Sequence, residues 1–273
     1  MIKPLQTELR KIRAYRVFWG MVILYVLAVF FVFFGFPSLI DYFSMKSESM
    51  EIKLLKNLIY NFPDVWQNLS WLASLRFFIK IFLGIIVIIL VTNEFNYGTI
   101  RLNIINGMSR WDVLKGKIGL VILFSLVATI LVLISGLILG LIFSSNTSFA
   151  FITKKWLFLL GYFVEVFSYM SFAIFLGFLL KKSGMAISVL FAYPIFELII
   201  SQWKVTEDYR QYLPFNALNH VIRTPNTSLI QYSSPKSQID LQTHIAGQDI
   251  GICLAYAALF LLLTYWILKK RDL

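Results

Sequence analysis

Long apolar runs constrain this chain more than any other feature of its sequence. No charged residue occurs between Ile118 and Thr153. A helix needs about 20 mostly apolar residues to cross the hydrocarbon core of a bilayer. The runs are continuous and do not alternate residue by residue, which favours helices over membrane-spanning strands. Six segments are long enough, at residues 18–40, 72–93, 118–143, 156–180, 184–201 and 250–268.

Composition and charge agree with a membrane protein. Of the 273 residues, 59% are hydrophobic and 14% are charged, whereas a soluble domain carries about 25% charged residues. We therefore expect an all-α polytopic membrane protein, with a single transmembrane domain over residues 1–273. Lysine and arginine are densest in the short segments 1–17, 94–117, 181–183 and 269–273. By the positive-inside rule, these segments and both termini face the cytoplasm, across the plasma (inner) membrane.

The first 17 residues predict a helix that lies on the membrane surface. Ile2, Leu5, Leu9 and Ile12 recur at helical spacing, and basic residues occupy the other faces. Such a helix rests on the inner leaflet and contacts anionic lipid headgroups. The alternative is a simple basic flank of the first span. The net charge of +11 thus predicts membrane lipid as a partner, and no nucleic-acid-binding module is recognisable.

A second surface segment precedes the last span. Residues 202–249 are polar and long, and we assign them to the outer side. Within them, the stretch "YLPFNALNHVI" is amphipathic enough to turn back toward the membrane as a re-entrant helix.

Four charged residues fall within or beside the apolar runs. Glu165 lies near the middle of the fourth run and Glu197 close to the outer end of the fifth. Arg76 and Lys80 lie near the outer end of the second. Charged groups at membrane depth are costly, so each is a candidate for a translocation path. The alternative is structural, in which acids and bases pair within the bundle. We prefer this alternative for Glu197 and keep both for Glu165.

Catalytic, cofactor and metal motifs are not recognisable in the sequence. It contains no phosphate-binding GxxxxGK[ST] loop, no His-Glu-x-x-His and no Gly-x-Ser-x-Gly. Cys253 is the only cysteine, so neither an intrachain disulfide nor a Cys/His metal cluster can form. We assign no catalytic, cofactor-binding or metal-binding residue to this chain and do not expect an enzyme.

The segment 94–117 is longer and more structured than a simple loop between two spans. Residues 95–106 can form a helix of about 18 Å, at about 1.5 Å per residue. Gly107 can end this helix, and Ser109 with Asp112 can form a capping box at the start of the next. A short rigid helix across the cytoplasmic surface suits docking into a groove of a partner.

This segment resembles a known family. Glu94 followed by Gly98 and Thr99, then Arg101, Ser109–Arg110 and Gly116–Lys117, is similar to the Glu-x-x-x-Gly-Thr region of ABC type-2 permeases. These are the membrane subunits of ATP-driven exporters. The order of a basic interfacial helix, six spans and a long outer segment before the sixth also resembles this family.

The resemblance implies that 95–106 is a coupling helix that inserts into a separate ABC ATPase subunit. It further implies two permease subunits and two ATPase subunits, with ATP and Mg²⁺ bound by the ATPase. The candidate coupling residues are Glu94, Gly98, Thr99, Arg101, Arg110 and Lys117. Glu94 would be an anchor that pairs with Arg101, Arg110 or the partner, and its alternative is an ordinary solvated acid. Gly98 would permit a bend, and the Thr99 hydroxyl would satisfy a backbone group freed there.

Two other functions remain open from the sequence alone. One is a membrane anchor or sensor that an ATPase drives and that moves an outer-surface machine, with 202–249 as its working part. The other is an intramembrane hydrolase. An ATPase partner would favour either of the first two functions, and activity without nucleotide would favour the hydrolase.

Overall fold

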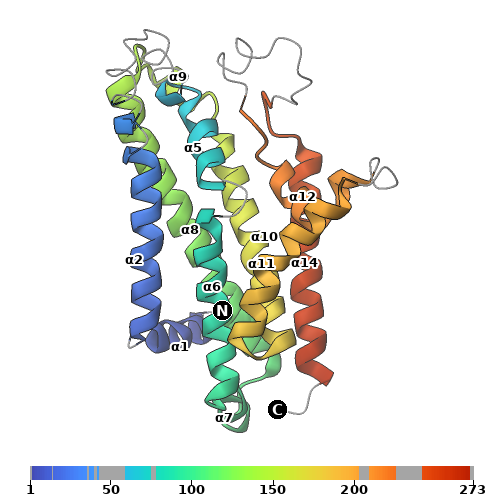
Figure 1. Cartoon of the computed structure of the whole chain (residues 1–273). Helices are drawn as coiled ribbons and strands as arrows, with labels where there is room; N and C mark the ends of the chain where they lie inside the picture. Colours follow the sequence, from blue (N-terminus) through green and yellow to red (C-terminus); the bar gives the residue numbers. More distant parts are fainter. Residues whose placement is uncertain are drawn as a thin grey trace.

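The structure is a computed structural model of the whole chain, shown in Figure 1. It describes residues 2–13, 15–35, 37–39, 42, 59–74, 78–202, 209–225 and 242–270. Within these ranges the chain forms helices and turns, and its only bridge pairing is an isolated one between Pro225 and Gln242. The all-helical fold predicted from the sequence is therefore confirmed for the described residues.

Six helical stretches are long and apolar enough to cross a membrane, by length and composition. They match the six predicted segments. The second one is shifted, because its helix α6 begins six residues later than predicted and ends at Asn96. The stretches are α2 (Arg16–Phe30) with the π-helical turn η1 (Phe31–Gly35), α6 (Phe78–Asn96), α8 (Arg110–Phe143), α9 (Phe149–Thr153) with α10 (Leu157–Leu180), α11 (Ser183–Ile200) and α14 (Gly247–Lys270).

The helix α10 runs through the centre of the bundle. Most of its residues are buried, and it packs against α6, α8 and α14. Only Lys181 and Lys182 separate it from α11, so these two helices form the tight hairpin that their short connection requires. Lys181 adopts a left-handed conformation (φ 58°) at this turn.

The helix α1 (Ile2–Arg13) lies across one end of the bundle, beneath α2 in Figure 1. It packs closely on α8 because Gly116 and Gly119 leave room for it. A Cβ atom on Gly116 would lie 3.3 Å from the Pro4 carbonyl oxygen, and one on Gly119 would lie 3.3 Å from a Leu5 methyl group. A helix therefore forms in the segment 1–17, as predicted, and its position on the membrane surface stays a prediction.

The buried face of α1 differs from the predicted one. Ile12 is buried as expected, but Leu9 is 39% exposed and the carboxylate of Glu8 is buried in its place. Glu8 faces inward because two lysine ammonium groups meet it there, as described below.

A buried helix, α5 (Val65–Ser74), precedes α6 and lies between it and the far end of the bundle (Figure 1). Two glycines of α8 accommodate α5 and the turn before it, since Cβ atoms on Gly136 and Gly140 would lie 2.7 Å from Trp66 of α5 and 2.3 Å from Phe62 of the turn. The Trp66 indole also donates to the Ile152 carbonyl at 2.6 Å. Arg76 lies in 75–77, outside the described residues.

The amphipathic stretch before the last span forms the short helix α12 (Pro214–His220). Its residues Phe215, Ala217 and Leu218 are buried, and it packs against α10, α11 and α14. A 3₁₀ turn, η3 (Arg210–Tyr212), precedes it. Both chain ends lie in the half of the bundle that carries α1 and α7 (Thr99–Ile105) (Figure 1). We call this end the α7 end and the opposite one the α9 end.

Candidate functional site

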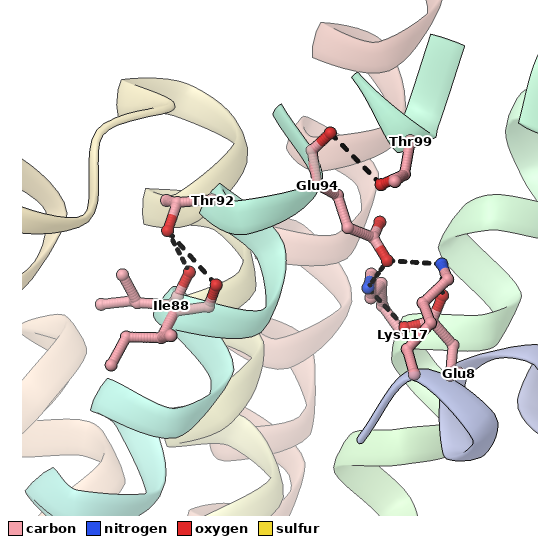
Figure 2. A network of polar contacts seen from close by, with 8 residues as sticks. Glu8, Ile88, Thr92, Glu94, Thr99 and Lys117 are labelled. Carbon is pink, nitrogen blue, oxygen red and sulfur yellow. Dashed lines mark hydrogen bonds and ion pairs between the residues drawn. The ribbon is translucent and has the colours of Figure 1, made fainter. Parts of the chain in front are cut away.

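The helix α7 is separated from α6 by a turn at Tyr97 and Gly98. Gly98 adopts a left-handed conformation with φ 64°, which side chains with a Cβ atom rarely occupy. The predicted helix over 95–106 is therefore divided, because its first residues complete α6 and the remainder form α7. The Thr99 hydroxyl donates to the Glu94 carbonyl at 3.4 Å, as the sequence predicts (Figure 2).

The end of α7 and the start of α8 follow the predicted pattern. Gly107 has φ 89°, and its amide donates to the Ile104 carbonyl at 3.0 Å. The Asp112 amide then donates to the Ser109 hydroxyl at 3.1 Å, which makes Ser109 the cap of α8. The hydroxyl in turn donates to the Asp112 carboxylate. These hydrogen bonds end α7 and begin α8, and the Thr99–Glu94 bond connects the start of α7 to α6.

The outer face of α7 is apolar and exposed. Tyr97, Leu102 and Ile105 are 76%, 57% and 71% exposed, whereas Ile100 is buried against the bundle. Figure 1 shows α7 at the extreme of the α7 end, beyond the other labelled helices. The three exposed side chains, which we call the α7 face, thus lie outside the packed core.

Arg101 and Arg110 have different surroundings. Arg101 is exposed on α7 and makes no hydrogen bond or ion pair with any described residue. The Arg110 guanidinium donates to the carbonyl oxygens of Leu268, at 2.7 Å, and of Lys269. It thereby satisfies backbone acceptors that are left free at the C-terminal end of α14. Neither arginine pairs with Glu94, so the prediction is wrong for these two residues, and a contact of Glu94 with the partner subunit stays a prediction.

Glu94 instead belongs to a group of four charged residues, which we call the basal cluster: Glu8, Lys11, Glu94 and Lys117. One Glu94 oxygen lies 2.6 Å from Lys11 Nζ and 2.7 Å from Lys117 Nζ. Glu8 contacts the same two lysines, with 2.8 Å between its carboxylate and Lys11. Figure 2 shows Glu8, Glu94 and Lys117 pointing toward one another from α1, α6 and α8.

The basal cluster balances two acids with two bases in a largely desolvated place. The side chains of Glu8, Glu94 and Lys117 are 8%, 5% and 3% exposed, and Lys11 is 31% exposed. Burial acts to raise the pKa of the Glu8 carboxyl. The neighbouring Lys117 and Lys11 outweigh burial and hold this pKa below its ordinary value of 4.5. The four side chains therefore bind α1, α6 and α8 together at the base of α7.

Glu8 and Lys11 were not among the residues predicted from the sequence. A signal was present, because Glu8 is the only acidic residue before Asp41 and lies in a strongly basic helix. A lone acid there indicates a specific partner, although the sequence does not name Lys117, which is more than a hundred residues away.

A second charged group lies deeper in the bundle. Lys80 of α6 forms an ion pair with Glu165 of α10, and both are almost fully buried. Ser74 donates to the other Glu165 oxygen at 2.6 Å. The Lys80 ammonium also donates to the Asn219 side chain of α12 at 3.1 Å and lies 5.9 Å from the centre of the Tyr169 ring. We call Lys80 and Glu165 the buried pair.

Lys80 lies at the start of the second spanning helix, in the first turn of α6. This helix begins part-way along the bundle, with α5 beyond it (Figure 1), so Lys80 is level with Glu165. The pairing that the structural alternative required for Glu165 is therefore present.

Glu197 has a different kind of partner from the expected base. Its carboxylate accepts hydrogen bonds from the backbone amides of Phe215, at 2.9 Å, and Asn216. These amides are in the first turn of α12, where helix N–H groups lack intrahelical acceptors and a negative charge is favourable. Glu197 thus ties the end of α11 to the start of α12.

The described residues contain no group of three or more His, Cys, Asp or Glu side chains that could hold a metal ion. Among the described residues, the most buried ion pairs are those of the basal cluster at the α7 end and of the buried pair deeper in the bundle.

Comparison with known proteins gives two findings. Over 79 residues the chain is 38% identical to the uncharacterized protein YhcI of Bacillus subtilis (strain 168). That match covers 29% of this chain and only 25% of the relative, so most of the relative lies outside it. The description "Protein of unknown function (DUF2705)" belongs to a family model that matches residues 39–273. Since this match includes most of the sequence, the chain belongs to the DUF2705 family.

Proposed function

We propose that the chain is the membrane-spanning permease subunit of an ABC exporter and that α7 docks into a separate ATPase subunit. The α7 face carries the proposal. Tyr97, Leu102 and Ile105 are apolar and largely exposed, at the end of the bundle that holds both chain ends. In the proposed orientation this end is cytoplasmic, so these side chains would face water and not lipid. Exposed apolar patches of this kind are typical of sites that bind another protein.

The basal cluster gives α7 a mechanical connection to the membrane helices. Glu94 precedes α7 and Lys117 follows it, and the two are joined by a buried ion pair. Glu8 and Lys11 add α1 to the same group. A force on α7 would therefore reach α1, α6 and α8 together. This arrangement supports a coupling role, because a docked ATPase could move several spans through one short helix.

The complete transporter would contain partners of this chain. ATP and Mg²⁺ would bind the ATPase, since the sequence contains no phosphate-binding loop. A second permease subunit, identical or related, would complete the membrane part in the plasma (inner) membrane. The exposed arginines Arg10 and Arg13 of α1 would contact anionic headgroups on the cytoplasmic leaflet.

Purification of the full chain from its native membrane in mild detergent tests the docking. We expect an ATPase with a phosphate-binding loop, identified by mass spectrometry, to co-purify with the unmodified chain. Leu102→Glu together with Ile105→Glu should abolish the association, because two charges would replace apolar contacts. Phe149→Glu is the matched control, since Phe149 is 81% exposed on α9 at the other end. Equal recovery of the ATPase with the α7 double variant would exclude docking through α7.

A further inference from the structure

The short helix α12 is held by polar contacts from two different spans. Asn219, near its C-terminal end, accepts a hydrogen bond from Lys80 of α6 at 3.1 Å. Glu197 of α11 accepts hydrogen bonds from the amides of its first turn. Because Asn219 is bonded to a residue of α6, an axial movement of α6 must either displace α12 or break this hydrogen bond.

The helix α6 reaches both charged groups of the bundle. Lys80 lies in its first turn within the buried pair, and Glu94 lies in its last turn within the basal cluster. These residues are 14 positions apart in one uninterrupted helix, which corresponds to about 21 Å at about 1.5 Å per residue. A helix of this length moves nearly as a rod, so a displacement at Glu94 is carried to Lys80.

The helices around Lys80 are packed against the rest of the bundle, so α6 would move relative to them. Glu165 belongs to α10, the central helix, most of whose residues are buried. The neighbouring helix α5 is seated on α8, where Gly136 and Gly140 leave space for Trp66 and Phe62. The hydrogen bond between Lys80 and Asn219 therefore joins α6 to the short helix α12, next to α5 and α10, most of whose residues are buried.

From these contacts we propose that α6 transmits displacement of α7 to α12 and that the Lys80–Asn219 hydrogen bond is the point of transmission. The proposal rests on the proposed function for its driving force, because the ATPase would move α7. The connection itself is a property of this chain alone. Movement of α12 would then accompany each change at the basal cluster, which lies at the other end of α6.

A thiol reporter at the start of α12 tests the connection without an ATPase. Leu213 is partly buried and immediately precedes α12. The reporter is Leu213→Cys in a Cys253→Ala background, reconstituted in lipid vesicles and labelled with a membrane-impermeant maleimide. Glu94→Gln, which weakens the basal end of α6, should raise the labelling rate about fivefold or more, the lower range of coupling between distant sites.

The decisive comparison is a double-variant cycle. With Asn219→Ala present, the reporter should label at a new rate that Glu94→Gln no longer changes, because the link between α6 and α12 is gone. If Glu94→Gln has the same effect with and without Asn219, or has none in either background, the proposal is overturned. Should Glu94→Gln fail to fold, Lys11→Met perturbs the same Glu94 oxygen from a partly exposed position.

Thr92→Val is the matched control on the same helix. Thr92 is buried two positions before Glu94, and its hydroxyl bonds within α6, to the Ile88 carbonyl at 2.8 Å (Figure 2). Thr92→Val should leave the labelling rate of the reporter unchanged. A rise equal to that caused by Glu94→Gln would overturn the proposal. Addition of the co-purified ATPase with a non-hydrolysable ATP analogue forms a separate arm. If the ATPase with the analogue does not change the labelling rate but Glu94→Gln does, the result contradicts the role of the ATPase and not the connection through α6.

Discussion

Glu94 and Lys117 lie 2.7 Å apart across the base of α7, so the helix that leads into α7 and the helix that leaves it are joined by a buried ion pair. Removal of Lys117 leaves two buried carboxylates, Glu8 and Glu94, with only the partly exposed Lys11 to compensate them. The loss is commonly about 3–5 kcal/mol.

Lys117→Met should lower the free energy of unfolding of the detergent-solubilised protein by about 3 kcal/mol, within the range for a broken buried pair. Thermal unfolding followed by tryptophan fluorescence measures the change. Lys11→Met is the comparison, because Lys11 is 31% exposed and water can replace part of its contact. A Lys11→Met loss as large as that of Lys117→Met would contradict the assigned difference in burial.

The Glu8 carboxyl predicts how this end of the protein responds to acid. Its pKa is held below the ordinary value of 4.5 in the folded chain by Lys117 and Lys11, against the opposing effect of burial. A depressed pKa contributes stability that is present above the unfolded pKa and is lost as the pH falls through the folded one. Melting temperatures of the unmodified chain and of Glu8→Gln should therefore differ at pH 7 and converge below pH 4.5. A constant difference down to pH 3 would contradict this prediction.

The buried pair makes a prediction about a double variant. Lys80→Met and Glu165→Gln should each destabilise the protein by about 3–5 kcal/mol, because each leaves a buried group without its charged partner. The double variant should lose clearly less than the sum, since no unpaired charge remains. Thermal unfolding of the four proteins measures the interaction free energy. Strict additivity would mean that Lys80 and Glu165 do not stabilise each other.

Gly140 should not tolerate a methyl group. A Cβ atom there would lie 2.3 Å from the Phe62 ring, so Gly140→Ala should cost about 1–3 kcal/mol, as overpacking commonly does. Phe62→Leu should recover part of this loss. Gly20→Ala is the control, because no atom lies within 4 Å of its built Cβ position. Equal melting temperatures for the two alanine variants would contradict the close seating of α5 on α8.

Features set by local chemistry could be predicted from the sequence. The spans follow from bilayer thickness, and the cap at Ser109 and the Thr99 contact with Glu94 follow from neighbouring residues. Contacts between distant segments could not be predicted in the same way. The partners of Glu94 and the link from Lys80 to Asn219 depend on how whole helices pack. The pairing of Lys80 with Glu165 could not be predicted either, because hydropathy alone does not show that α6 begins part-way along the bundle.

The last prediction concerns Arg101, on the exposed side of α7. It makes no hydrogen bond or ion pair with any described residue, so its charge would be available for an acidic rim on the proposed ATPase subunit. Arg101→Glu should therefore weaken the complex and uncouple ATP hydrolysis from transport, while insertion and melting temperature stay unchanged. Charge reversal at a partly desolvated contact can cost several kcal/mol, compared with about 0–1 kcal/mol for an exposed pair.

Arg13→Glu is the control for Arg101→Glu, because Arg13 is exposed on α1 and is expected to contact lipid headgroups. Cysteines placed at 101 and at 13 would be tested for cross-linking to the ATPase. We expect a cross-link from position 101 and none from position 13. If position 101 never cross-links and Arg101→Glu leaves the ATPase activity of the complex unchanged, α7 is not the coupling helix. In that case the exposed apolar residues Leu102 and Ile105 would require another partner.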